Sequence, residues 1–156
     1  MRGRLRMVGI SLPGLILVLS VLTPPKPSSH AGDPVLQGAQ VGTDVLEILQ
    51  RSCGDCHTED THYPWYSYVA PVSWLVESDV SGGRRHLNLS RWSEYPLARK
   101  ERNLSEIANQ VKDGDMPLVQ YTWIHRKAKL SAADVAAIFQ WTQTERTRLI
   151  NEAGRQ

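Results

Sequence analysis

The sequence has few of the features that would place it in a sheet, repeat or disulfide class. Its 156 residues include only two cysteines, too few for a dense disulfide scaffold. No alternating strand pattern of any length, no internal repeat and no low-complexity domain is present. These absences leave a single all-α domain with a modest core as the expected fold class.

An excess of charge of one sign is also missing once the amino terminus is set aside. The chain opens with MRGRLR, a mostly apolar stretch over residues 7–22 and the breaker-rich TPPKPSSHAGDP, an order typical of an export segment. Without Arg2, Arg4, Arg6 and Lys26, the 18 basic residues become 14 against 16 acidic ones. No basic patch remains that would indicate nucleic-acid binding.

The export segment is short for a membrane span. Its apolar stretch is interrupted by glycine, serine and proline and does not reach the roughly 20 residues of a confident transmembrane helix. We expect residues 1–31 to be an export signal cut after Ser29-His30-Ala31, or an amino-terminal anchor that tethers the protein to the inner membrane through residues 7–22. Either outcome predicts a periplasmic protein, with a linker over 32–43, the domain over 44–150 and a tail over 151–156.

Helical spacing predicts four or five short helices joined by long loops. Four of them have start or stop signals: they are expected from Thr43 into Cys53, from Pro71 to Asp79, from Asn103 to Gly114 and from Ser131 onward. The apolar stripe of the last helix should face the core through Val135, Ile138, Phe139, Thr142 and Leu149. The loops over 57–70 and 113–130 are long for a compact domain, which indicates that they serve a site.

Both cysteines lie in CGDCH, residues 53–57. A CxxC pair can form a disulfide or a thioredoxin-like redox centre, but that centre follows a strand, and the segment before Cys53 is helical. A structural zinc site needs four ligands, whereas no third cysteine exists and the other histidines are scattered. Both alternatives are therefore disfavoured.

CxxCH with the histidine adjacent is the attachment signature of c-type haem. Two sulfurs three positions apart can reach the two vinyl groups on one porphyrin edge, and the next residue brings its imidazole under the iron. Attachment takes place outside the cytoplasm, where the export segment directs the chain. The motif predicts one covalent haem c, with thioethers at Cys53 and Cys56 and His57 as the proximal iron ligand.

The distal iron ligand is expected to be Met116, the one methionine outside the export segment. It lies in the loop GDGDMPLVQY, where Pro117 stiffens the backbone, and methionine opposite histidine suits electron transfer. Methionine also serves as core filler, which is the plainer interpretation. The rival ligands are His125, His86 and His62.

Side chains around the haem are predicted less directly. Arg84 and Arg85 are expected to hold the haem propionates through charge-assisted hydrogen bonds, unless they are simply solvated. Five aromatic residues follow the motif and are expected to wall the haem: Tyr63, Trp65, Tyr66, Tyr68 and Trp74.

Two longer stretches carry a family resemblance: CGDCHTEDTHYPWYSYVAPVSWLVESDVSGGRRHLNLSRW and GDMPLVQYTWIHRKAKLSAADVAAIFQWT. Through them the chain resembles the small bacterial haem-binding domain proteins, which look like single-haem c-type cytochromes, from about Val45 to Ile150. The resemblance implies covalent haem at Cys53 and Cys56, His57 as proximal ligand and Met116 as distal ligand. It is looser to ordinary cytochrome c, in which a first helix, a methionine loop and a last helix follow in the same order.

The sequence thus predicts a cytochrome c-like electron carrier and not an enzyme. Its partners would be redox proteins and the haem attachment machinery, with no nucleic acid. The alternative is a haem sensor or peroxidase-like enzyme in which the distal iron site is open or Met116 is displaced. A third interpretation makes the haem purely structural.

Overall fold

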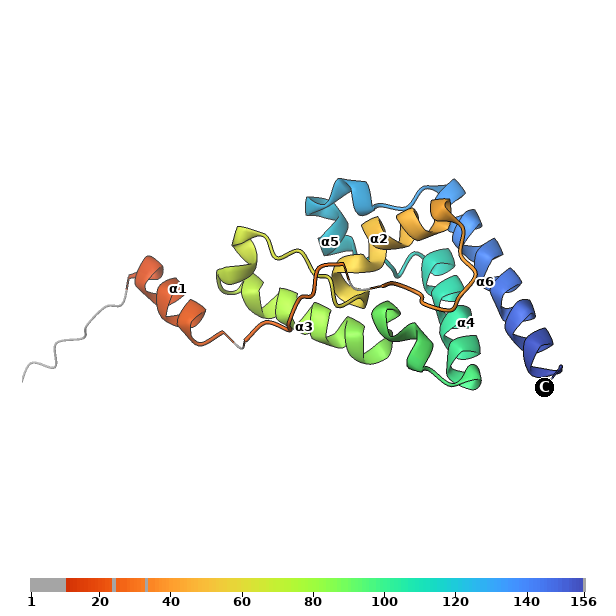
Figure 1. The fold of residues 1–156 in the computed structure, drawn as a ribbon. Coiled ribbons are helices and arrows are strands. Elements are labelled where there is room, and N and C mark those ends of the chain that lie inside the picture. Colours follow the sequence, from red (N-terminus) through yellow and green to blue (C-terminus); the bar gives the residue numbers. More distant parts are fainter. Residues whose placement is uncertain (1–10, 24, 33, 156) are drawn as a thin grey trace, which may run out of the picture.

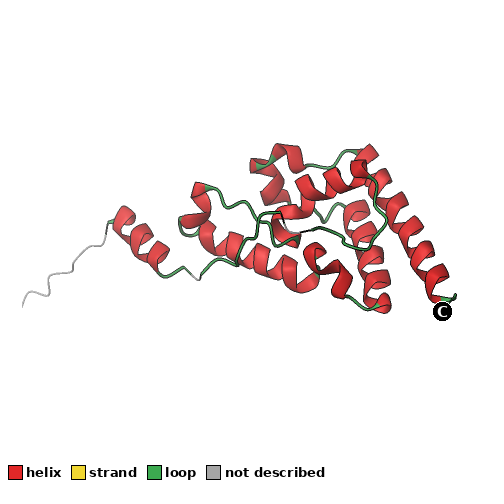
Figure 2. Cartoon of the chain, in the orientation of Figure 1, coloured by secondary structure: helices red, strands yellow, loops and turns green. Residues whose placement is uncertain are grey.

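The computed structural model describes residues 11–23, 25–32 and 34–155. Within these ranges every regular element is helical, as Figures 1 and 2 show, so the all-α prediction is confirmed. Six α-helices fall in the described part: α1 (Leu12–Val21), α2 (Thr43–His57), α3 (Val72–His86), α4 (Leu97–Asp113), α5 (Val119–Ile124) and α6 (Ala132–Ala153). Three 3₁₀ turns join them: η1 (Trp65–Tyr68), η2 (Leu89–Glu94) and η3 (Arg126–Ala128).

The core lies where α4 and α6 pack side by side and α2 crosses them (Figure 1). Each helix offers one apolar stripe to this contact, and the 3₁₀ turn η2 adds Trp92, which has no exposed surface. Side chains of this size stabilise a fold by about 1.5–3 kcal/mol each when fully buried. The buried cluster comprises Leu36, Val45, Leu49, Leu89, Trp92, Leu104, Ile107, Val111, Ile138 and Trp141.

The start of α6 follows the local signals in its sequence. The Ser131 side chain accepts a hydrogen bond from the Asp134 backbone amide at 3.1 Å, and the Asp134 carboxylate accepts from the Ser131 amide at 2.8 Å. The same carboxylate contacts Arg51 of α2 at 2.7 Å. This capping box therefore ends the preceding loop and also ties α6 to α2.

Two helices are longer than their sequence signals indicate. α2 begins after Gly42 and continues through the cysteine motif to His57, instead of ending at Cys53. α3 continues through Gly82-Gly83 to His86, where a stop was expected. In both cases packing between the two helices outweighs the low helical propensity of glycine, a cost of only about 1 kcal/mol per residue.

Two further expectations about helices were wrong. α4 begins at Leu97 after Pro96, so Asn103 and Glu106 lie inside the helix and are not its capping box. Phe139 is 41% exposed, although its neighbour Ile138 is fully buried. The predicted end of α4 at Gly114 is confirmed, because this glycine adopts a left-handed conformation with φ 78°.

Residues 34–43, the described part of the segment predicted as a linker over 32–43 apart from Gly32, pack on α6. Leu36 is 2% exposed, the Trp141 indole donates to the Gln40 carbonyl at 2.9 Å, and the Gln40 amide donates to Glu145 at 3.3 Å. Glu145 is itself buried and paired with Arg148 at 2.6 Å. α6 also runs to Ala153, three residues into the predicted tail.

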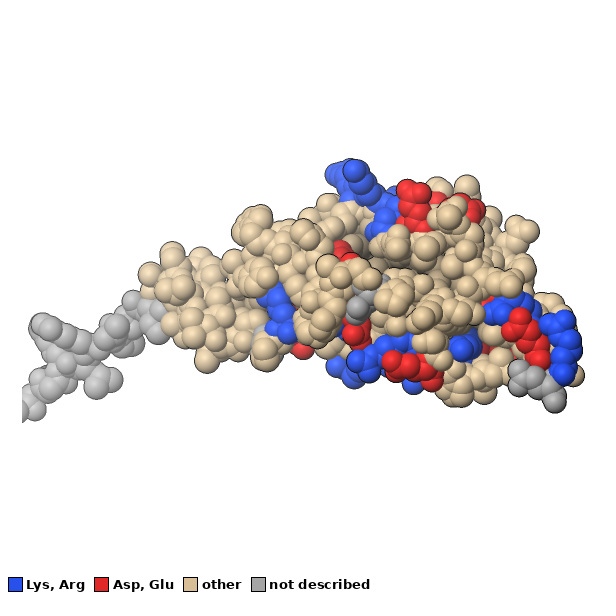
Figure 3. Space-filling model, viewed as in Figure 1, with Lys and Arg blue, Asp and Glu red and all other residues tan. Residues whose placement is uncertain are grey.

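The first helix stands apart from the core. α1 projects from the end of the domain at which η1 and α3 begin (Figure 1). Its apolar side chains are largely exposed. On the face shown in Figure 3, α1 is uncharged, and basic and acidic side chains are interspersed over the rest. Across the described ranges, no helix has both the length and the apolar character needed to cross a membrane. The predicted export segment extends into residues 1–10, which lie outside the described part.

Candidate functional site

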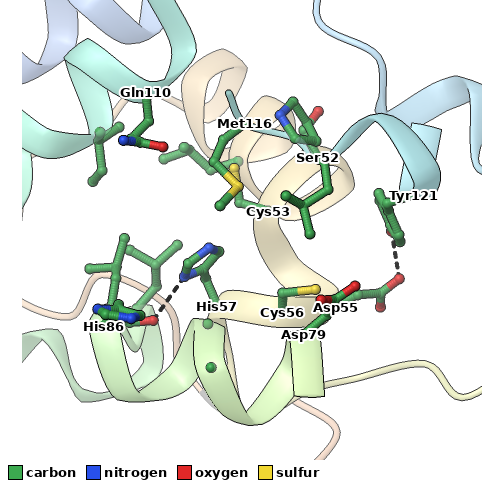
Figure 4. Close-up of a pocket in the computed structure, with 18 of the residues that line it drawn as sticks. Ser52, Cys53, Asp55, Cys56, His57, Asp79, His86, Gln110, Met116 and Tyr121 are labelled. Carbon is green, nitrogen blue, oxygen red and sulfur yellow. Dashed lines mark hydrogen bonds between the residues drawn. The ribbon is translucent and has the colours of Figure 1, made fainter. Parts of the chain in front are cut away.

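A cavity of about 510 Å³ lies between the second half of α2, α3, α4 and the turn that follows α4. Its volume is in the range of cofactor sites, and most of its wall is hydrocarbon. The predicted ligands Cys53, Cys56, His57 and Met116 all line it, as Figure 4 shows. The fold therefore brings together residues that are about 60 positions apart in the sequence.

Helix α2 presents its two cysteines on one face of the cavity. Cys53 and Cys56 are three residues apart in a continuous helix, which puts their side chains on neighbouring turns, and both are free thiols. Burial raises the pKa of Cys53 to about 12, and the nearby Cys56 adds to the shift. Burial followed by the carboxylates of Asp79 and Asp55 raises the pKa of Cys56 to about 12. Thiols with such pKa values stay protonated at neutral pH, unlike those of a redox-active CxxC centre.

The imidazole of His57 is held by a backbone carbonyl. Its Nδ1 lies 3.0 Å from the carbonyl oxygen of Leu87, the residue that follows α3. Donation from Nδ1 leaves Nε2 with its lone pair, the arrangement found in metal-ligating histidines. Burial lowers the pKa of His57, although the bond to Leu87 acts in the opposite direction. His57 is therefore a neutral ring with one free nitrogen.

Met116 reaches the cavity from the side opposite His57 (Figure 4). The turn that carries it is closed by the left-handed Gly114, and the amides of Asp115 and Met116 both donate to the Gln110 carbonyl, at 3.0 and 3.2 Å. This capping motif satisfies a terminal carbonyl of α4 and fixes the methionine relative to the helix. Core residues such as Ile107 and Val111 line the cavity as well, so the ligand role of Met116 rests on its position across from His57.

On the side of the cavity formed by α3, the close approach of this helix to α2 depends on glycine. A Cβ on Gly83 would lie 2.5 Å from the Cys56 carbonyl oxygen and 3.1 Å from its Cβ, closer than real contacts allow. Gly82, its neighbour in α3, also lines the cavity, and a Cβ there would meet only the end of the Arg85 side chain, at 3.8 Å. These two glycines let α3 lie against the cysteine motif and leave open space beside it.

One polar group in the wall has no partner. Asn103 is 3% exposed and lines the cavity, yet its side-chain amide nitrogen has no hydrogen-bond partner among the described residues. An unsatisfied buried donor costs about 1–3 kcal/mol, and native structures usually explain each one. The pattern of the sequence does not reveal this group, because it predicts Asn103 as the cap of its helix.

A family model described as a haem-binding domain matches residues 15–144. The chain belongs to this haem-binding domain family. No curated protein and no solved structure matches it. The family match confirms the resemblance read from the sequence and shows that the domain binds haem. It begins inside α1, upstream of the predicted domain start at residue 44.

The residues of this haem-binding domain fit their cofactor. The cavity offers two thiols on one wall, a neutral imidazole with a free nitrogen, and a thioether on the opposite wall. Soft sulfur and imidazole donors are those that hold haem iron in c-type proteins. The space beside Gly82 and the unpaired amide of Asn103 leave room and a hydrogen-bond donor for the group.

The predicted aromatic wall does not form. None of the five aromatic residues after the motif lines the cavity, and Trp65 is 78% exposed. The aromatic ring that does line it is Tyr121, whose hydroxyl donates to Asp55 at 2.6 Å. Burial followed by this bond raises the pKa of Tyr121 above its ordinary value. Sequence reasoning missed Tyr121 because it lies 64 positions beyond His57.

The two arginines and the rival histidines are placed as follows. Arg84 and Arg85 do not line the cavity, and Arg84 donates to the Thr58 carbonyl at 2.8 Å and to the Ser28 carbonyl at 2.6 Å. Their contact with propionates stays a prediction that this placement does not favour. Of the rival ligands only His86 lines the cavity, while His125 bonds the Tyr66 hydroxyl at 2.6 Å.

Proposed function

We propose that this haem-binding domain holds its haem covalently and carries single electrons outside the cytoplasm. The observation that carries the proposal is the opposition of His57 and Met116 across a cavity whose wall includes both cysteines. When bound, the haem supplies a one-electron couple at its iron. The protein would hold the iron through His57 and Met116 and would keep water away from it.

Each ligand is held by a different element, which suits a carrier that rearranges little. His57 is oriented through the Leu87 carbonyl and Met116 through the Gln110 carbonyl. Neither ligand depends on a flexible side-chain partner. The apolar wall and a neutral thioether ligand both disfavour extra positive charge on the iron, which raises the reduction potential.

A cytochrome c-like arrangement is part of the proposal. α2 carries the cysteine motif, α6 is the last helix, and the two are in contact, with the methionine turn between them in the chain. We place the domain in the periplasm, with a redox protein as its partner and the haem attachment machinery as the supplier of its cofactor. The interspersed surface charges of Figure 3 suit transient docking.

Covalent attachment is tested by haem-stained denaturing gels of protein made with working attachment machinery. A stained band at the mass of the chain is expected. Its absence, with haem still present under native conditions, would contradict the thioethers and leave haem binding intact.

The electron-carrier role is tested through coordination. Ferric protein should show the weak far-red band of methionine ligation, and ferrous protein should resist carbon monoxide. Met116→Ala should abolish the band and admit carbon monoxide, whereas His86→Ala, which also alters the cavity wall, should leave both unchanged. Rapid carbon monoxide binding by the unaltered protein would instead indicate a sensor or a peroxidase-like enzyme.

A further inference from the structure

We propose that Asn103 is a haem-binding residue and that its side-chain amide donates a hydrogen bond to a haem propionate. This inference rests on the proposed mode of attachment and extends it to the other end of the cofactor. The observation behind it is the buried amide nitrogen of Asn103, a residue of the cavity wall, which has no hydrogen-bond partner among the described residues.

The chemistry of haem narrows the choice of acceptor. The porphyrin nitrogens coordinate the iron and cannot accept a hydrogen bond. The edge of the ring is hydrocarbon, and thioether sulfur is a weak acceptor. The two propionate carboxylates are the only strong acceptors of the group, and a bond to a carboxylate is about twice as strong as one between neutral partners. A buried N–H donor therefore finds its best partner there.

The geometry of the cavity agrees with this acceptor. Thioethers at Cys53 and Cys56 fix the vinyl edge, so the propionates lie at the opposite edge. Figure 4 shows Gln110 and His86 away from Cys56, Asp55 and Tyr121. Asn103 lies two turns before Gln110 on the same face of α4, and Arg84 and Arg85 do not line the cavity.

Infrared difference spectra of the ferric and ferrous protein test the bond, with the haem carboxylates labelled with ¹³C. Asn103→Leu should shift one labelled carboxylate band, while Asn109→Leu, an exposed asparagine on the same helix, should not. Both variants should keep the far-red band. Unshifted carboxylate bands, or a change confined to the far-red band, would overturn the proposal.

The unaltered protein gives a second readout, in case Asn103→Leu fails to fold. In the ferrous state the Asn103 amide protons should show nuclear Overhauser contacts to propionate methylene protons. Absence of these contacts would also overturn the proposal. A haem-stained gel of the same sample reports separately on covalent attachment.

A second inference rests on a different observation, the contacts of residues 25–32, which we call the strap. We infer that the strap is retained in the mature protein, so that the chain is not cut after Ala31. This goes beyond the proposed function and assumes only that the chain is exported. The strap lies along the loop that follows His57 and along α3, as its hydrogen bonds show.

The side chains that form hydrogen bonds with the strap do not line the cavity. The Tyr63 hydroxyl donates to the Pro27 carbonyl at 3.0 Å, and Arg84 donates to the Ser28 carbonyl at 2.6 Å. Ser29 and Thr61 exchange two bonds, in which the Ser29 hydroxyl donates at 2.9 Å and accepts at 3.0 Å. A chain that began at residue 32 would lose all of these bonds, and Arg84 would keep only those to Thr58 and Thr61.

Two more contacts extend the strap at both ends. The Lys26 ammonium lies 3.7 Å from the ring centroid of Tyr68, a cation–π contact, and the His30 amide donates to the Glu59 carbonyl at 2.6 Å. The family match also includes the strap, because it begins at residue 15. The strap thus behaves as part of the folded domain.

Intact-mass and amino-terminal analysis of the protein from its native membrane and periplasmic fractions tests retention. The mature chain should contain residues 25–31, and an amino terminus at Gly32 would overturn the inference. In the full chain, Ser29→Ala should speed proteolysis of the loop over 58–63 by about fivefold, because two bonds of the strap are lost.

Ser28→Ala is the matched control, because it removes an exposed hydroxyl and keeps the carbonyl that Arg84 uses. Equal proteolysis rates in the two variants would show that the strap does not hold the loop. Haem staining of each variant keeps this result separate from any failure of haem attachment.

Discussion

The two halves of helix α2 meet different surroundings. In the first half, Val45 is buried in the core shared with α4 and α6 and does not line the cavity, and Leu49, at the middle of the helix, belongs to both. In the second half, Cys53, Cys56 and His57 border a cavity of about 510 Å³. The first half therefore packs against other parts of the protein, whereas the second half packs against the haem when it is bound. The stability of this domain should divide along the same helix.

Removing the cofactor should have the largest effect. In a Cys53→Ala/Cys56→Ala variant without haem, we expect amide exchange in α3 and in the loop over 58–71 to accelerate at least tenfold. Exchange in α6 should change little, because none of its residues lines the cavity and its contacts lie in the core. Hydrogen exchange with mass spectrometry measures both regions together, and uniform loosening would contradict the division.

In the core around the first half of α2, the largest loss of stability is expected from breaking a buried ion pair. Arg148→Met leaves the buried Glu145 carboxylate without its guanidinium at 2.6 Å and should lower the free energy of unfolding by about 3 kcal/mol. Denaturant unfolding measures the loss, and the haem spectrum should not change. Arg155→Met, an exposed position near the end of the chain, is the control and should cost less than about 0.5 kcal/mol.

A third prediction concerns the contact between α2 and α3, where a substitution should affect the second half of α2 and its haem. Gly83→Ala brings a methyl group to within 2.5 Å of the Cys56 carbonyl oxygen, so α3 must move away. We expect a loss of about 2 kcal/mol together with poorer haem incorporation. Gly54→Ala, between the cysteines but with open space at its Cβ, should cause neither. Similar losses in both variants would contradict the steric explanation.

The smallest effect is expected where α6 begins. Amide donation from Ser131 and the Arg51 guanidinium hold the pKa of Asp134 below its ordinary value of 3.8. Because the folded-state pKa is lowered, the stabilisation is present above that ordinary value and is lost as pH falls through the folded-state pKa. Asp134→Asn should cost about 1 kcal/mol at pH 7 and nothing in strong acid. A difference that is constant from pH 7 to pH 2 would argue against a charge effect.

Parts of the fold that depend on neighbouring residues were predictable from the sequence. Ser131 with Asp134 and the left-handed Gly114 act within one turn, and both were placed correctly. The signals at Gly82-Gly83 and Asn103 were equally local, but packing against α2 and an earlier start at Leu97 outweighed them. A local signal holds only where no tertiary contact competes with it.

The site shows the same distinction. Cys53, Cys56 and His57 are adjacent in the chain, and Met116 was singled out by being the one methionine of the domain, so all four could be named in advance. Asn103 and Tyr121 could not, since only the fold brings them to the cavity. The aromatic residues after the motif are near it in sequence, but none of them lines the cavity, so the expected wall does not form.

The bond between His57 and Leu87 has a mechanical consequence for the proposed electron transfer. Leu87 accepts from the ring at 3.0 Å and donates its own amide to the Gly83 carbonyl at 2.8 Å, and Gly83 abuts Cys56. Ring, helix end, glycine and cysteine thus form a closed loop of short contacts. In the proposed electron carrier, such a loop would resist rotation of the imidazole when the iron changes charge, and the reorganisation energy would be low.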